Sequence, residues 1–307
     1  MATKTIVVLG TSAQVPKKNR NHVALYLRWD KEDLLFDPGE GTQRQMVTFG
    51  VPLNRIRKIF ITHFHGDHCL GLPGVIQRLS LHQVSHPVEI IYPRRGEKFL
   101  RALLSCAVFH NRVELVPVAV EESGFVEVQG ELRVEAVRLD HGVETFGYRI
   151  SDPIQWNIVP ERLPPQMERR LIGVLKRQGW VEVSGKRVNL EDVAVKKQSQ
   201  SFAFCMDTRY CEGAVRLAKG VDVLACEATY LQEDEALAHE YMHLTSREAA
   251  TIALKGGVGK LILMHFSQRY PHLSSFEEEA RSIFPHTHVA HDGMKITLPQ
   301  VKRDIQS

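Results

Sequence analysis

The stretch His63-Phe64-His65-Gly66-Asp67-His68 contains four side chains that can bind metals within six positions. It follows the apolar segment of residues 58–62, and a pattern of helical periodicity comes after it. In a chain with 15 histidines, chance alone produces such a cluster in on the order of one chain per thousand. A polar, pH-sensitive loop is the alternative interpretation, but the density of ligands favours a metal site.

The spacing within this cluster suits two neighbouring metal positions. His63 and His65 lie two residues apart on an extended segment, so their side chains point to the same side. The turn at Gly66 lets Asp67 and His68 point toward a second position. Imidazole and carboxylate groups suit Zn²⁺, and no cysteine cluster is present to close a structural site.

One cluster cannot complete two metal sites, so further ligands must come from other strand ends. His141, Asp207 and His265 each follow a segment that we predict to be a β-strand. In α/β folds the carboxyl ends of strands carry functional residues. A single histidine at a strand end is more often structural, whereas four strands that end in such residues indicate a common site.

Short apolar segments alternate with helical patterns along the chain, which is typical of layered α/β structure. The predicted strands are residues 5–9, 23–29, 33–37, 58–62, 88–92, 113–118, 131–139, 145–151, 202–206, 221–226, 260–264 and 295–298. The predicted helices are residues 42–50, 69–83, 96–109, 212–218, 246–255 and 275–283. Thr245 and Glu248 form a capping-box pattern at the start of the fifth helix.

Residues 152–200 separate two batches of predicted strands and helices and carry the whole charge excess of the chain. They contain nine Lys or Arg and six Asp or Glu residues, an excess equal to the net charge of +3. Residues 167–177 predict a helix, and residues 181–188 around Ser184-Gly185 predict a hairpin. We expect a projecting basic arm. Its charge alone fits a polyanion-binding surface and a solvated surface insertion equally well.

The composition excludes several classes of protein. With 307 residues, of which 43% are hydrophobic and 24% charged, we expect a globular chain with a large core. No apolar stretch reaches 18 residues, so we predict no membrane span. The apolar run of residues 6–9 is too short for a signal peptide. Five scattered cysteines without a C-x-x-C pair fit reduced thiols, so we predict a cytoplasmic protein.

Further motifs combine with the histidine cluster into a family resemblance. They are Leu9-Gly10-Thr11, Pro16-Lys17-Lys18-Asn19-Arg20-Asn21, Phe36-Asp37-Pro38-Gly39-Glu40-Gly41-Thr42-Gln43, Gly71-Leu72-Pro73-Gly74, His141-Gly142-Val143-Glu144, Asp207-Thr208-Arg209, Glu227-Ala228-Thr229-Tyr230, His243-Leu244-Thr245 and His265-Phe266-Ser267-Gln268-Arg269-Tyr270. With them the sequence resembles the metallo-β-lactamase superfamily and, within it, the ribonuclease Z family of tRNA 3′-processing endonucleases. The resemblance covers nearly the whole chain.

The resemblance implies an α/β fold, a four-layer αββα sandwich, formed by a single domain over residues 1–307. The inserted arm of residues 152–200 would then be a tRNA-binding exosite. The implied activity is that of a zinc-dependent endoribonuclease, which removes the 3′ trailer from precursor tRNA and leaves a 3′-hydroxyl on the tRNA. A homodimer is also implied, in which the arm of one subunit serves the site of the other.

The resemblance implies two zinc ions per subunit. The implied ligands are His63, His65 and His141 for the first ion, Asp67, His68 and His265 for the second, and Asp207 as a bridge between them. Asp67 is also the implied general base. His243, oriented and kept cationic by Glu227, is the implied acid for the leaving group, with a capping or packing role as the alternative.

Four more residues receive expected roles. Arg20, Asn21 and Arg269 are implied to contact the RNA backbone, although either arginine could instead form a structural salt bridge. Asp37 lies in a glycine-rich turn and is expected to orient a ligand rather than to bind metal itself.

Two other functions remain compatible with these residues. A dinuclear-metal hydrolase of the same superfamily that acts on a small ester, lactone or thioester would need neither the basic arm nor the pair of His243 with Glu227. An RNA-binding protein with structural zinc is the other, although zinc sites without cysteine are seldom structural. The arm lacks the family's Gly-Pro-rich pattern, so its binding of tRNA is inferred from position, length and basicity.

Overall fold

Two seven-stranded sheets form the frame of the protein, for which a computed structural model describes residues 4–197 and 199–298. The first sheet has the order β18 (Lys295–Thr297), β1 (Thr5–Gly10), β2 (Ala24–Trp29), β3 (Glu32–Phe36), β4 (Ile56–Phe60), β5 (Val88–Pro93) and β6 (Leu115–Val120). The second has the order β17 (Thr287–Val289), β16 (Lys260–Met264), β15 (Val223–Glu227), β14 (Ser201–Cys205), β9 (Phe146–Ser151), β8 (Arg133–Arg138) and β7 (Gly124–Val126). The chain therefore builds one sheet, then the other, and returns to the first only with β18.

Aromatic side chains from both sheets fill the space between them. Phe36 of β3 stacks on Phe60 of β4 with ring centroids 4.6 Å apart. From the second sheet, Phe202 and Phe204 approach the Phe36 ring with centroid separations of 5.7 and 5.1 Å. Ring pairs at these distances attract one another beyond their apolar burial. One face of each sheet thus belongs to a common core.

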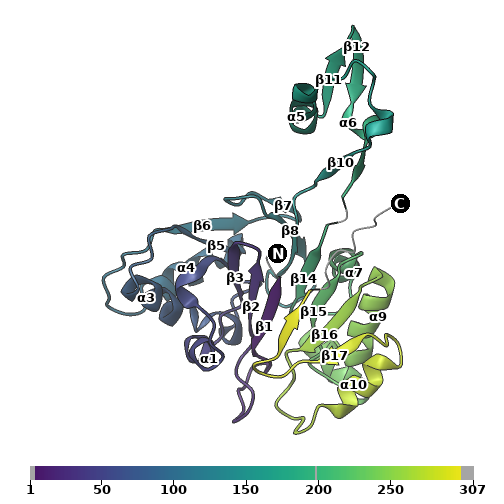
Figure 1. The fold of residues 1–307 in the computed structure, drawn as a ribbon. Helices are drawn as coiled ribbons and strands as arrows, with labels where there is room; N and C mark the ends of the chain where they lie inside the picture. Colours follow the sequence, from purple (N-terminus) through teal and green to yellow (C-terminus); the bar gives the residue numbers. More distant parts are fainter. Residues whose placement is uncertain (1–3, 198, 299–307) are drawn as a thin grey trace. The chain divides into compact units, whose positions relative to one another are not determined.

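Helices cover the outer face of each sheet (Figure 1). The first sheet packs against α1 (Thr42–Thr48), α3 (Leu72–Leu81) and α4 (Glu97–Leu104), and the second against α7 (Glu212–Ala218), α9 (Ser246–Gly256) and α10 (Ser274–Arg281). Shorter helical turns are η1 (Leu53–Arg55), α2 (Gly66–Cys69), η2 (Arg94–Gly96), η4 (Gln232–Asp234) and α8 (Glu235–Tyr241). The order helix, sheet, sheet, helix confirms the predicted αββα sandwich.

Asp152–Gln200 folds as a compact unit of its own. Its elements are β10 (Trp156–Ile158), η3 (Pro160–Arg162), α5 (Arg169–Gln178), β11 (Trp180–Val183), β12 (Lys186–Asn189), α6 (Leu190–Val193) and β13 (Ala194–Lys196). The buried side chains of its small core are Leu175, Val181, Val183, Leu190, Val193 and Ala194. The hairpin turns at Ser184 and Gly185, whose φ angles of 50° and 76° are those of the tight turns that favour hairpins.

Two predicted helices are shorter than expected. The helix predicted over residues 69–83 is interrupted at Gly71, because the Gly71 N–H donates to the carbonyl oxygen of Pro38 at 2.8 Å rather than to a carbonyl of the preceding turn. The helix predicted over residues 96–109 corresponds to α4, which ends where the Ser105 hydroxyl bonds to carbonyl oxygens of the last turn.

Two helices, α8 and α9, lie between strands β15 and β16 in sequence. The predicted capping box at the start of α9 is present, with Glu248 N donating to Thr245 Oγ1 and Thr245 N donating to Glu248 Oε2. Helix α8, in contrast, is not predicted. Its segment shows no apolar periodicity, because Leu237 is its only aliphatic side chain larger than alanine.

Candidate active site

Loops that follow strands β4, β8, β14 and β16 bring together all seven residues predicted as metal ligands. Their ligand atoms form two groups, within each of which they lie no more than 4.8 Å apart: His63, His65, His141 and Asp207, and Asp67, His68 and His265. Because the carboxyl ends of these four strands lie at one edge of the sandwich, residues far apart in sequence come together there.

In the first group, ring nitrogens face one another at short range. His65 Nδ1 lies 3.0 Å from His63 Nε2 and 3.3 Å from His141 Nε2. Asp207 Oδ2 lies 3.5 Å from His63 Nε2 and 3.8 Å from His141 Nε2. Three nitrogens and one carboxylate oxygen therefore converge.

The second group is equally close. His68 Nε2 and His265 Nε2 are 3.2 Å apart, and Asp67 Oδ2 lies 3.4 Å from each of them. Asp207 Oδ1 lies 3.3 Å from His68 Nε2 and 3.2 Å from His265 Nε2. Asp207 thus presents one oxygen to each group, as a bridging carboxylate would.

Two threonines orient histidines of the site from behind. His63 Nδ1 donates to Thr62 Oγ1 at 3.0 Å, and His265 Nδ1 donates to Thr229 Oγ1 at 2.9 Å. Each threonine can accept because its own hydroxyl donates to a carboxylate, at 2.7 Å for Thr62 and 2.6 Å for Thr229. The sequence predicts no role for either threonine; the only signal is that each lies near a strand end beside a predicted site residue.

Two further hydrogen bonds orient His68 and His141. His68 Nδ1 donates to Asp37 Oδ2 at 2.8 Å, in agreement with the expectation that Asp37 orients a ligand. His141 Nδ1 donates to the carbonyl oxygen of Met242 at 3.0 Å. In four of the five histidines, a proton on Nδ1 leaves the lone pair of Nε2 directed into the site.

The two groups fit divalent cations. Lone pairs that face one another across about 3 Å repel unless a proton or a metal lies between them. Asp207 Oδ1 is buried and makes no hydrogen bond with any described residue, and such a buried acceptor is costly without a partner. Imidazole and carboxylate ligands without cysteine are typical of catalytic zinc sites and suit other first-row metals as well.

Backbone strain is concentrated at the same edge of the sandwich. Asp37, Asp207 and His265 have φ angles of 42°, 44° and 62°, in a region that costs non-glycine residues on the order of 1–3 kcal/mol each. All three lie just beyond the ends of buried strands, which hold the backbone in place. The fold therefore maintains a costly conformation where it directs these side chains into the site.

The electrostatics of the site favour a bound cation. Burial holds the pKa of His63 well below its ordinary value. Burial would also lower the pKa of His68, but the carboxylates of Asp207 and Asp67 raise it well above the usual range. The histidines in turn hold the pKa of Asp207 low against the effect of its burial. The negative charge that favours a proton on His68 equally favours a metal in its place.

His243 and Glu227 form the predicted pair at the side of this cluster. His243 Nδ1 lies 3.0 Å from Glu227 Oε1. Burial alone would lower the pKa of His243, but the charges of Glu227 and Asp207 raise it to about 9. Glu227 is fully buried and also accepts hydrogen bonds from Thr208 N and Leu244 N. The His243 ring lies 5.2 Å from the His141 ring and 5.5 Å from that of His265.

The three predicted RNA contacts occupy different environments. Arg20 is only 6% exposed and donates to the carbonyl oxygen of Tyr270 at 2.9 Å. Asn21 donates to the carbonyl oxygen of Glu40 at 2.7 Å. Arg269 lies on the wall of the active-site cavity, with its side chain 44% exposed and paired to Asp234 at 2.8 Å. Of the three, Arg269 is the one best placed to reach a ligand in that cavity.

A cavity of about 670 Å³ opens onto the metal-ligand groups. Its wall includes Leu70 and Tyr241, which are 53% and 55% exposed, together with Tyr230. The sequence predicts no role for Leu70 or Tyr241, because a single exposed apolar residue carries no pattern. They give the cavity apolar surface beside its charged floor.

Fold and site together define a metal-binding hydrolase of the metallo-β-lactamase superfamily: residues 19–147 match the family model described by that name, and residues 185–266 match that of the β-lactamase superfamily domain. The chain is 45% identical to ribonuclease Z of Nocardia farcinica over 97% of this chain and 99% of that protein. It is 40% identical to ribonuclease Z of Chlamydia pneumoniae, with 98% of each chain covered. The chain belongs to the ribonuclease Z family.

A solved structure agrees with this assignment. The short form of human tRNase Z is 28% identical, has a TM-score of 0.66, and is matched over 96% of this chain and 100% of that one. The chain is accordingly a hydrolase, an endoribonuclease of tRNA 3′ processing. In the part of the chain that the structure describes, we find no helix with the length and apolarity needed to cross a bilayer.

Proposed function

We propose that this endoribonuclease depends on two zinc ions per subunit. The proposed ligands are His63, His65 and His141 for the first ion, Asp67, His68 and His265 for the second, and Asp207 for both. The observation that carries the proposal is the convergence of four imidazole nitrogens on the two oxygens of Asp207, with His65 Nδ1 within 4.8 Å of the first group's other ligand atoms. When bound, such a pair of ions holds phosphodiester oxygens and makes a water molecule available as a nucleophile near neutral pH.

Asp67 is the proposed general base. Burial would raise the pKa of Asp67, but His68 and His265 hold it well below its usual range, so the carboxylate stays ionised. Its side chain lies on the floor of the active-site cavity. From there it can accept a hydrogen bond or a proton from the water that attacks phosphorus, and it fixes the direction of that attack.

His243 is the proposed general acid. The departing sugar oxygen is a poor leaving group and needs a proton. Against the effect of burial, the charge of Glu227, with that of Asp207, raises the pKa of His243 to about 9, so the imidazole stays protonated. The ring lies on the wall of the cavity next to the metal-ligand histidines, where it can donate to that oxygen. Hydrolysis in this direction leaves the 3′-hydroxyl on the tRNA.

The arm, Asp152–Gln200, is the proposed grip on precursor tRNA. All nine of its Lys and Arg residues are exposed, and Arg187 packs over the exposed ring of Trp180 at 4.5 Å. Exposed cations bind phosphates, and structured RNA is recognised chiefly by shape and backbone. The proposal includes a homodimer in which each arm serves the other subunit's site, as the family resemblance implies. We place this enzyme in the cytoplasm, where its five free cysteines would stay reduced.

The decisive experiment is cleavage of precursor tRNA by the purified chain, with metal analysis of the same sample. We expect a single cut at the 3′ side of the acceptor stem, a 3′-hydroxyl product, and about two zinc ions per subunit. A preparation that hydrolyses a small ester, lactone or thioester but leaves precursor tRNA intact would contradict the proposal.

A further inference from the structure

Glu144 has no role in the reaction proposed above, although it lies three residues after the metal ligand His141. Its side chain is only 6% exposed, in the loop of residues 139–145 that joins β8 to β9. A buried carboxylate is costly unless hydrogen bonds and opposite charges compensate it. The partners of Glu144 therefore indicate what the fold gains by burying this group.

Two contacts compensate the carboxylate of Glu144, and they come from different sheets. Glu144 Oε1 accepts a hydrogen bond at 2.9 Å from Nη2 of Arg138, the last residue of β8 in the second sheet. Glu144 Oε2 accepts a hydrogen bond at 2.8 Å from the backbone N–H of Arg95, in η2, which follows strand β5 of the first sheet. The side chain thus joins the loop that carries His141 to a segment of the other sheet.

The segment η2 also supports two histidines of the first metal-ligand group. Phe64 stands between His63 and His65 in the chain, and its ring packs closely against η2: a Cβ atom on Gly96 would lie 2.1 Å from it. In a close-packed interior, the position of η2 restrains the backbone on which both histidines lie. One short helical turn therefore contacts both the segment of these histidines and the loop of residues 139–145.

Backbone contacts hold the two ends of this loop. Near its start, Asp140 N donates to Thr208 Oγ1 at 3.1 Å, within the second sheet's own side of the site. Just after its end, Phe146 N donates to the carbonyl oxygen of Thr62 at 3.1 Å. Glu144 adds a second connection to the first sheet, and this one lies closer in sequence to the metal ligand.

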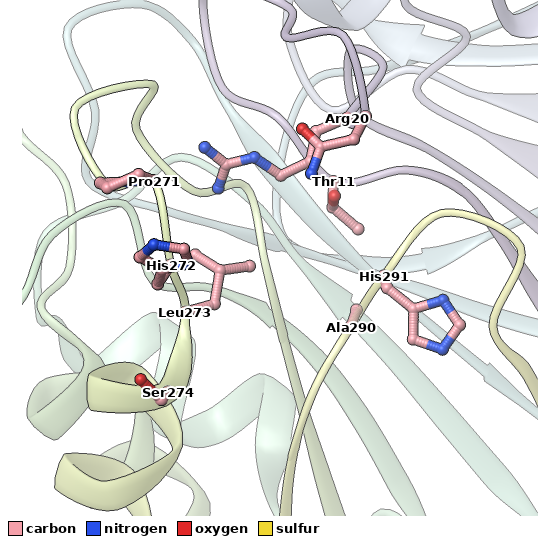
Figure 2. A pocket seen from close by; sticks show the side chains of 9 residues that line it. Thr11, Arg20, Pro271, His272, Leu273, Ser274, Ala290 and His291 are labelled. Carbon is pink, nitrogen blue, oxygen red and sulfur yellow. The ribbon is translucent and has the colours of Figure 1, made fainter.

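Arg20 makes a connection of the same kind between two other loops. Figure 2 shows its guanidinium group extending from its own loop toward Pro271. It donates to the carbonyl oxygens of Ser267 and Tyr270, in the segment that follows the metal ligand His265. Buried charged side chains thus join separate loops beside both metal-ligand groups.

We propose that Glu144 is a positioning residue for the first metal ion: it holds His141 in place opposite His63 and His65. The inference rests on the zinc centre proposed above. The observation that carries it is that the Glu144 carboxylate and the Phe64 ring contact adjacent residues of η2. Partners that orient metal ligands set metal affinity by about 10- to 100-fold, and Glu144 acts one contact further away.

The test is a chelator titration of the zinc-loaded full chain, with the released zinc counted per subunit. Glu144→Ala removes the connection between the loop and Arg95 N. We therefore expect one zinc ion to leave at about tenfold lower chelator concentration than in wild type, and the other to leave as in wild type. Glu121→Ala is the matched control, because its 70% exposed carboxylate lies on the same charged rim, 3.7 Å from Arg94. It should release both ions as wild type does.

Glu144→Gln covers the case in which the alanine variant folds poorly. Glutamine keeps the size of the side chain but has a single acceptor oxygen, so it can pair with Arg95 N or with Arg138, not with both. We expect the same selective release of one zinc ion, with a smaller shift than in Glu144→Ala.

A double variant separates positioning from a general structural effect. When His141→Ala removes the ligand, there is no imidazole left for Glu144 to position, so adding Glu144→Ala should not change release of the remaining zinc ion. Equal shifts in both backgrounds, equal shifts of both ions, or no shift in Glu144→Ala would overturn the proposal. A wild-type chain that binds no zinc would contradict the metal centre as well, so the two failures are distinguishable.

Discussion

The metal-ligand groups and the arm are built in opposite ways. The metal-site histidines other than His65 have nearly or fully buried side chains, and each makes an orienting hydrogen bond with its Nδ1 atom. The ligands come from four strand ends spread over about two thirds of the chain. The arm forms its core from one continuous stretch, Asp152–Gln200, and exposes all of its cations. Chemistry here depends on long-range assembly, whereas the surface proposed to grip RNA depends on a locally folded segment.

Substitutions in the two regions should therefore have different effects. Substitution of a buried ligand side chain leaves neighbouring polar groups unpaired and distorts the site. An exposed cation that is lost weakens a screened, distributed attraction. Changes at the strand ends should therefore abolish the chemical step, and changes in the arm should reduce binding of the large substrate only.

Asp207→Asn should have the largest effect, and a fully active variant would contradict the contrast drawn between the two regions. The amide cannot offer a negative oxygen to both groups, so we expect less than one bound zinc per subunit and a loss of kcat/KM on the order of 10⁴ or more. Metal analysis and single-turnover cleavage measure the two effects. Asp30→Asn, in an exposed turn, is the control and should keep both values. Full zinc content with full activity in Asp207→Asn would exclude it as a bridging ligand.

His243→Ala sharpens the comparison because it separates proton transfer from metal binding. We expect zinc content to be retained and kcat to fall on the order of 10²–10⁴-fold, since the leaving oxygen loses its proton donor. A substrate with an activated leaving group, such as a nitrophenyl phosphodiester, should lose much less. His239→Ala, an exposed histidine of α8, serves as control. Equal losses on both substrates would indicate a structural role for His243.

Deletion of the arm tests the other half of the comparison. Ser151 and Ser201 pair directly in the sheet, so a short Gly-Ser link can replace Asp152–Gln200 without disturbing β9 and β14. We expect KM for precursor tRNA to rise on the order of 10- to 100-fold, with a weaker salt dependence. Activity on a small phosphodiester should stay the same. Replacement of the nine basic residues by Gln, with the arm retained, should give the same pattern if charge is responsible.

Glu227→Gln should produce the smallest change, a shift in pH dependence. Because the charge of Glu227 raises the pKa of His243 to about 9, its removal lowers that pKa. A general acid must be protonated, so activity falls as pH rises through its pKa. We therefore expect the alkaline limb of kcat/KM to move to lower pH, whereas Glu233→Gln leaves it in place. An unmoved limb would show that another group provides the proton.

The candidate site was largely predictable because its residues carry distinctive chemistry. A cluster of four ligands in six residues is rare by chance, and His141, Asp207 and His265 each follow an apolar strand. The orienting roles of Thr62 and Thr229 were not predictable, because threonines beside strand ends are common. Only the structure shows that each one accepts a hydrogen bond from a histidine ring of the site. Their roles depend on side-chain direction, which sequence spacing alone does not give.

The fold was predictable to a similar degree. Long, strongly apolar strands such as β16 coincide with their predicted bounds, since burial on both faces leaves a continuous apolar run. Helix α8 and the short strand β17 were missed because few residues carry their pattern. The break at Gly71 was missed because its N–H donates to the carbonyl oxygen of Pro38, a contact between residues distant in sequence.

The sequence by itself determined the kind of chemistry: which residue types are present, which strands they follow, and where the positive charge is concentrated. Only the tertiary structure decided which oxygen of Asp207 faces each group, that the Arg20 side chain is buried, and that Thr62 and Thr229 accept hydrogen bonds from His63 and His265. The physical reason is that local patterns set secondary structure and residue type, whereas distances between side chains from separate strands arise only when two sheets pack on a common core.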